Sequence, residues 1–147
     1  MHIQSIFAAA VAGILCANPA SAKIKDIDAL FQRSEPSQAT MTLSEEGQVW
    51  RVRFRAGGIP NGAATAADCE LEAVGPQDMD GVISASLVPF EGDINTLSSA
   101  DIGEDAIVIE VNVGPEGAFV TDTGASSRHC GLGSSIDGFY QRSDTGD

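Results

Sequence analysis

The sequence predicts an all-β domain, an antiparallel sandwich or small barrel, that follows a short N-terminal helix. After Ser34–Ser37, apolar and polar side chains alternate with period two, which is typical of half-buried strands. The chain's 16 glycines provide turn residues between these segments. No strand pattern alternates with a helix pattern, which argues against a parallel sheet. With 147 residues, 43% of them apolar, the chain is long enough for one packed domain.

The first 22 residues have the pattern of an export signal. Ile6–Ala17 is a continuous apolar or small stretch, and the small-x-small site Ala20–Ala22 follows it. We expect cleavage after Ala22, export to the periplasm, and a single β domain over residues 23–147. A lipoprotein signal at Cys16 is the alternative, although Leu15 stands where that processing needs a small residue.

The predicted elements begin with a helix over Lys23–Arg33, where Ile24, Ile27, Leu30 and Phe31 fall at helical spacing. Period-two patterns then predict strands over residues 48–55, 68–74, 82–88, 106–113 and 118–123, with a sixth candidate over 139–142. Gly114–Gly117 and Asp80–Gly81 are expected as tight turns between strands.

The first two of these strands are expected to pair antiparallel through a ladder of charges. Their apolar residues share one face, and Arg51, Arg53 and Arg55 would then lie opposite Glu72, Glu70 and Asp68. The alternative is that the arginines form an anion site. We favour the structural ladder because the neutralising acids are present in the neighbouring strand.

Two cysteines remain after removal of the signal, Cys69 and Cys130. An exported chain with an even number of cysteines normally pairs them, so we expect a disulfide between residues 61 positions apart. Two free thiols or a metal pair is the alternative, but His129 is the one further ligand nearby.

Three motifs suggest chemistry. Asp122–Ala125 resembles the active-site turn of retroviral-type aspartic proteases, but only 25 residues follow Asp122, so we interpret it as a polar turn. Asp78–Gly81 resembles the start of a calcium loop, yet its twelfth position is Pro89, which excludes an EF-hand and leaves weak calcium binding open. Gly131–Gly133 begins like a dinucleotide loop whose third glycine is replaced by Ile136. We expect no enzyme and no cofactor.

Charge restricts the class of partner. The chain has eight Lys and Arg against 21 Asp and Glu, and its net charge is therefore −13. This charge excludes nucleic-acid binding through a basic patch. No apolar run reaches the roughly 18 residues of a membrane span, so no stable membrane insertion is expected. Residues 56–127 contain 13 acids and no Lys or Arg. This composition fits either simple solubility or a surface for a strongly basic partner.

A small exported β domain with one disulfide and an acidic surface resembles the periplasmic inhibitors of c-type lysozyme from Gram-negative bacteria. That resemblance implies a polar loop that enters the catalytic cleft of a cationic lysozyme, aided by a basic residue and a tyrosine. The corresponding candidates are Ser134, Ser135, Tyr140 and Arg142, with the turn Ser126, Ser127 and Arg128 as the alternative insert. The competing hypothesis is an envelope-associated structural β protein without inhibitory activity.

Overall fold

The computed structural model describes residues 29–57, 69–131 and 133–143, and its main feature is a closed eight-stranded antiparallel barrel. The order around the barrel is β1-β10-β9-β8-β5-β4-β3-β2. A two-stranded sheet of β6 and β7 and the short helices α1 and α2 complete the fold. The elements are β1 Ala29–Arg33, β2 Ala39–Glu46, β3 Val49–Ala56, β4 Cys69–Gly75, β5 Val82–Leu87, β6 Phe90–Glu91, β7 Thr96–Leu97, α1 Ser99–Ile102, β8 Val108–Val113, β9 Gly117–Asp122, α2 Ala125–His129 and β10 Gly138–Arg142.

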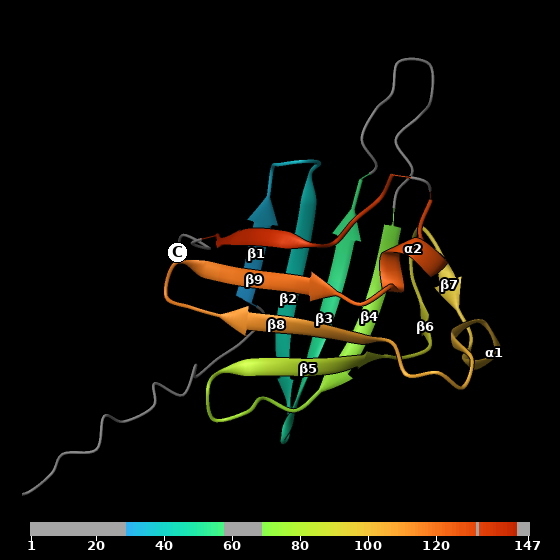
Figure 1. The fold of residues 1–147 in the computed structure, drawn as a ribbon, viewed down its shortest axis with the longest axis horizontal. Coiled ribbons are helices and arrows are strands. Elements are labelled where there is room, and N and C mark those ends of the chain that lie inside the picture. Colours follow the sequence, from blue (N-terminus) through green and yellow to red (C-terminus); the bar gives the residue numbers. More distant parts are fainter. Residues whose placement is uncertain (1–28, 58–68, 132, 144–147) are drawn as a thin grey trace, which may run out of the picture.

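The barrel is flattened into two layers. Strands β2, β3 and β4 run at a steep angle across β5, β8 and β9 (Figure 1). The sheet continues from one layer to the other where β4 pairs with β5 and where β10 pairs with β1. The all-β prediction is therefore confirmed, and of the two architectures expected, the structure is the barrel.

The helix expected over Lys23–Arg33 is not supported. Residues 23–28, with Ile24 and Ile27, lie outside the described residues, and residues 29–33 form strand β1. Phe31 and Arg33 point inward while Gln32 is exposed, and β1 pairs with both β2 and β10. The few apolar residues of this segment fit the spacing of a helix as well as that of a strand. Pairing with two neighbouring strands favours the strand.

The five main predicted strands and the sixth candidate are all present, as β3, β4, β5, β8, β9 and β10. The Gly114–Gly117 turn joins β8 to β9, with the Gly114 N–H donating to the Gly117 carbonyl at 2.8 Å. Strand β2 was not predicted, although Ala39, Met41 and Leu43 alternate with polar residues and are buried.

Inward-facing residues of both layers form one apolar core. Its largest fully buried side chains include Tyr140, Phe31, Phe54 and Met41. The rings of Phe54 and Tyr140 meet edge to face with centroids 6.2 Å apart.

The predicted disulfide is present: Cys69 at the start of β4 is bonded to Cys130 at the end of α2, with Cα atoms 5.0 Å apart. It ties α2 to the barrel wall.

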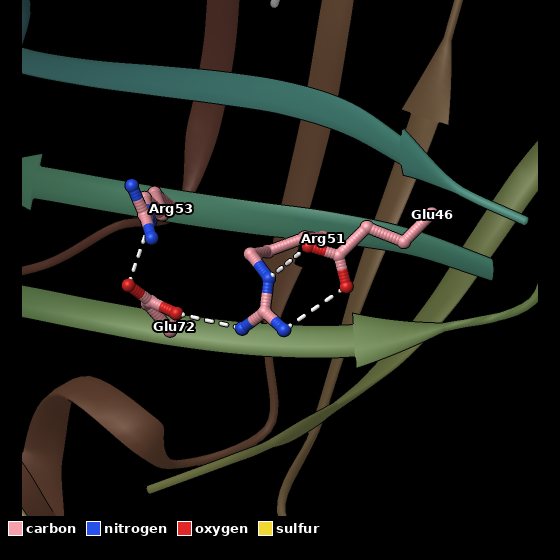
Figure 2. Close-up of polar contacts among 4 residues, drawn as sticks. All are labelled: Glu46, Arg51, Arg53 and Glu72. Atoms are coloured by element: carbon pink, nitrogen blue, oxygen red, sulfur yellow. Dashed lines mark hydrogen bonds and ion pairs between the residues drawn. The ribbon is translucent and has the colours of Figure 1, made fainter. Parts of the chain in front are cut away.

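The charge ladder between β3 and β4 has a different register from the predicted one. Arg53 lies opposite Glu72 and Arg55 lies opposite Glu70, so the pairing is shifted by two residues, and Arg51 faces Val74. Asp68 lies outside the described residues. The Glu72 carboxylate accepts hydrogen bonds from Arg51 at 2.8 Å and Arg53 at 2.6 Å, and Arg51 also bonds Glu46 (Figure 2). The ladder is therefore a cluster around one carboxylate.

Candidate functional site

The predicted insertion segment lies between α2 and β10 and is held tightly to the barrel. The Ile136 side chain is fully buried, and its N–H donates to the Ser126 hydroxyl at 3.1 Å. Arg33, which is 5% exposed, donates to the carbonyls of Ser135 and Asp137 and to Ser37. Sequence reasoning missed Arg33, since nothing local indicates that a strand-end arginine turns inward. We call residues 133–137 the strap; the bonds from Arg33 and the burial of Ile136 hold it against the barrel.

Tyr140 does not lie on this segment's surface. Its side chain is 0% exposed, and its hydroxyl donates to the Ile136 carbonyl at 2.8 Å. The Arg33 guanidinium sits 5.3 Å from the ring centroid. Burial raises the pKa of the Tyr140 hydroxyl far above its usual range. A ring without accessible surface cannot stack on a partner, so the expected contact role of Tyr140 is corrected to a core role.

The Asp122 turn, which resembles a protease motif, serves as a helix cap. The Asp122 carboxylate accepts the N–H groups of Gly124 at 2.9 Å, Ala125 at 2.6 Å and Ser126 at 2.8 Å. Burial alone would raise the pKa of Asp122, but the Ser126 hydroxyl and these three N–H groups outweigh it and hold that pKa below its usual value. Ser126 is 5% exposed. The turn therefore organises α2, and Ser126 is not a surface residue.

The remaining predicted contact residues are spread over three places. Ser127 and Arg128 are exposed on α2, while Ser134 and Ser135 are half-buried in the strap. The Ser135 hydroxyl is 3.1 Å from the Asp137 N–H, which donates to it. Arg142 lies at the far end of β10, where its guanidinium covers the Phe31 ring at 5.2 Å. The structure therefore does not bring these hydroxyls and Arg142 together.

The strand order gathers the acidic residues on one half of the barrel. Strands β9, β8, β5 and β4 are consecutive neighbours, and the whole segment 69–122 that contains them has 12 Asp and Glu and no Lys or Arg. We call this segment the acidic half. Several of its carboxylates have structural partners within the described residues. Seven are exposed and have none there: Asp80, Glu91, Asp93, Glu104, Asp105, Glu110 and Glu116.

Two exposed aromatic rings lie on the outer face of β9 and β10, next to the strand that carries Glu110. Phe119 of β9 and Phe139 of β10 are directly opposite each other and are 56% and 52% exposed. Asn112 and then Val82 continue the same row across β8 and β5. A Cβ on Gly117 would lie 2.6 Å from the Phe139 ring, so glycine there leaves room for it. The signal for these residues was in the sequence, since Phe119 is out of phase with the inward Ala118 and Val120.

Two further findings concern the described part of the chain. It contains no group of three or more His, Cys, Asp and Glu side chains that could hold a metal ion. None of its helices has the length and apolar character that a membrane span requires.

No protein-family model matches the chain, and neither the curated proteins nor the solved structures include a match to it.

Proposed function

We propose that this chain is a non-enzymatic binding protein for a strongly basic protein, with a cationic c-type lysozyme as the target to test first. The observation that carries the proposal is the acidic half. Four neighbouring strands and their connections present seven unpartnered, exposed carboxylates and no cation. The segment contributes no like charge of its own, and the arginines that reach it from β3, Arg51 and Arg53, are paired with Glu72.

Long-range attraction would bring such a partner to this side of the barrel. Opposite net charges speed encounter and orient it, and the effect weakens with salt over a Debye length of about 8–10 Å. Charge by itself gives loose binding, because exposed ion pairs contribute no more than about 1 kcal/mol each. A tight complex therefore needs apolar anchors as well.

Phe119 and Phe139 are the side chains that suit this anchoring role. Aromatic residues near the centre of an interface provide much of its binding energy, and a guanidinium or ammonium group is attracted to an aromatic face. Glu110 lies in the adjacent row of the same outer face, on β8 opposite Thr121. A partner arginine could thus stack on a ring and pair with a carboxylate on one surface.

Insertion of the Ser134–Ser135 strap into the catalytic cleft is the alternative contact. The strap is preorganised by Arg33 and by the buried Ile136. Preorganisation lowers the entropic cost of binding. The two contact modes differ in the residues on which inhibition depends.

The test uses the disulfide-bonded chain from residue 23 with purified c-type lysozyme. Titration calorimetry at low and physiological salt measures binding, and lysis of a peptidoglycan suspension measures inhibition. We expect a complex that weakens as salt rises. A Phe119→Ser/Phe139→Ser variant should raise the Kd at least about tenfold. Thr121→Ala, on the same face of β9, is the matched control and should bind like wild type.

The other outcomes separate the hypotheses. If Ser134→Ala/Ser135→Ala abolishes inhibition while the phenylalanine variant binds normally, the strap is the contact. Binding without inhibition would support the proposal that the chain binds basic proteins and would reject a role as a lysozyme inhibitor. Absence of any binding at low salt rejects the proposal and favours an envelope-associated structural protein.

A further inference from the structure

A second surface has the opposite chemical character. A pocket of about 550 Å³ lies where β1, β2, β3 and the end of β10 meet. Arg33, Arg55 and Arg142 line it, together with the amide side chains of Gln32, Gln38 and Gln141. Serine and threonine hydroxyls supply its other polar side chains, and no Asp or Glu is among the described residues around it. Every polar side chain there can donate a hydrogen bond.

The positive charge around this pocket contrasts with the negative net charge of the chain as a whole. The protein carries a net charge of −13, and 16 carboxylates belong to its described residues. The same residues include six arginines and no lysine, and three of the six line this one pocket. The pocket volume is within the range of about 300–1,000 Å³ that small-molecule sites occupy.

Within the described residues, no carboxylate forms an ion pair with an arginine of the pocket. Arg55 lies opposite Glu70 in the sheet, but the Glu70 carboxylate is turned toward the β6–β7 turn, where it accepts the Ile94 N–H at 3.0 Å. Gly92 lets it approach, since a Cβ there would lie 2.3 Å from a Glu70 carboxylate oxygen. Arg55 is exposed and has no ion pair within the described part of the chain.

The other two arginines are held by groups without net charge. Arg33 donates to backbone carbonyls and to the Ser37 hydroxyl. Arg142 covers the Phe31 ring, and its Nε–H is buried without a hydrogen-bond partner among the described residues. Within the described residues neither arginine has a carboxylate partner, so both leave the pocket with a net positive charge.

We propose that this pocket binds a small organic or inorganic oxyanion, one whose carboxylate or phosphate group is held by Arg55, which shares the outer face of the barrel with Thr40, Gln32 and Gln141. The planar guanidinium presents paired donors that match both groups. The glutamine amides and hydroxyls around the arginines bind the remaining oxygens. This site does not depend on the acidic half, because its strands are the other four of the barrel.

The experiment uses the disulfide-bonded chain from residue 23 and two probes, citrate and inorganic phosphate, at constant ionic strength in a chloride buffer. Calorimetry measures the Kd, and the rise in Tm with probe concentration gives an independent estimate of it. We expect saturable binding of at least one probe, and the probe that binds more tightly identifies a carboxylate or a phosphate site.

Two charge-matched variants make the test specific. Arg55→Gln removes an exposed pocket arginine and should weaken binding about tenfold, as expected for loss of a charge-assisted hydrogen bond. Arg128→Gln makes the same change in net charge on α2, outside the pocket, and should bind like wild type. If neither probe binds saturably, or if both variants weaken binding equally, the proposed site is wrong.

Discussion

The neighbours Phe139 and Tyr140 show what a single residue step decides in this protein. Tyr140 was expected to be a surface contact because the resemblance to the lysozyme inhibitors implies a tyrosine beside the polar loop. In β10 the side chains alternate between the two faces, so Tyr140 is in the core and Phe139 is 52% exposed. The strand was predicted, but its inward face was not, because that face depends on which neighbour β10 meets.

A residue-scale prediction concerns the cluster around Glu72. The side chain of Glu72 is 10% exposed and bonds two arginines, whereas that of Arg53 is 62% exposed. We expect Arg53→Gln to lower the free energy of unfolding by less than about 1 kcal/mol, as for exposed ion pairs. Glu72→Gln should cost about 1–3 kcal/mol, because it leaves the partly buried Arg51 with fewer acceptors. Urea denaturation measures both.

The double variant tests the pairing itself. If Arg53 and Glu72 interact as the distances indicate, the two losses should not add, and their sum should exceed the loss in Arg53→Gln/Glu72→Gln. Strictly additive losses would contradict a direct interaction.

At the scale of elements, the sequence predicted strands more reliably than the N-terminal segment. Five strands could be located because apolar and polar residues alternate over six or more positions, a pattern typical of strands. The sixth, β10, was a candidate over four residues only, and β2 was missed although it alternates over eight residues. Strand β1 spans five residues, and it is a strand because it pairs with β2 and β10. The local pattern of apolar residues carries no information about that pairing. Helix α2, likewise, is a consequence of the Asp122 cap rather than of an amphipathic pattern.

The Asp122 cap leads to a prediction with a defined pH dependence. Asp122→Ala removes the acceptor for three N–H groups at the start of α2 and should cost about 1–2 kcal/mol at neutral pH. The pKa of Asp122 is lower in the folded protein than the unfolded value of about 3.9. Its ionised form therefore stabilises the fold fully above that value, and the contribution disappears as pH falls through the folded pKa.

Equilibrium unfolding of both proteins between pH 7 and pH 2 checks this. The difference between wild type and Asp122→Ala should be constant near neutrality and shrink below about pH 4. Thr123→Ala in the same turn retains the carboxylate and is the control. A difference that grows as pH falls would contradict the cap.

At the scale of the whole molecule, the disulfide and the distribution of charge are the features that join distant segments. The pairing of Cys69 with Cys130 could be predicted by counting cysteines. The sequence showed that residues 56–127 are acidic and lack Lys and Arg. It did not show that these charges lie on one side of the barrel, because that depends on β4, β5, β8 and β9 being neighbours. The arginine pocket could not be predicted, since it gathers residues from four strands that no local pattern links.

The disulfide predicts a large loss of stability on reduction. Closing a loop between residues 61 apart stabilises the fold by about 4 kcal/mol through the entropy of the unfolded chain. Cys69→Ala/Cys130→Ala should therefore unfold at a much lower urea concentration than wild type. The mass of the oxidised protein after alkylation without reductant should show no added groups; two added groups would contradict the bond.

Closure of the barrel has a consequence for how any partner must recognise this protein. In the part of the chain that the structure describes, each of the eight barrel strands pairs with a neighbour on both sides, so none of them is an edge strand. An extended peptide joins a sheet only where unpaired backbone groups are available, which leaves outward side chains and connecting loops as the means of recognition. The inward positions maintain the framework, and the outward ones, apart from the Glu72 cluster, contribute less to it. The same barrel could therefore carry a different outer face, and its binding specificity could be transplanted by exchanging outward residues alone.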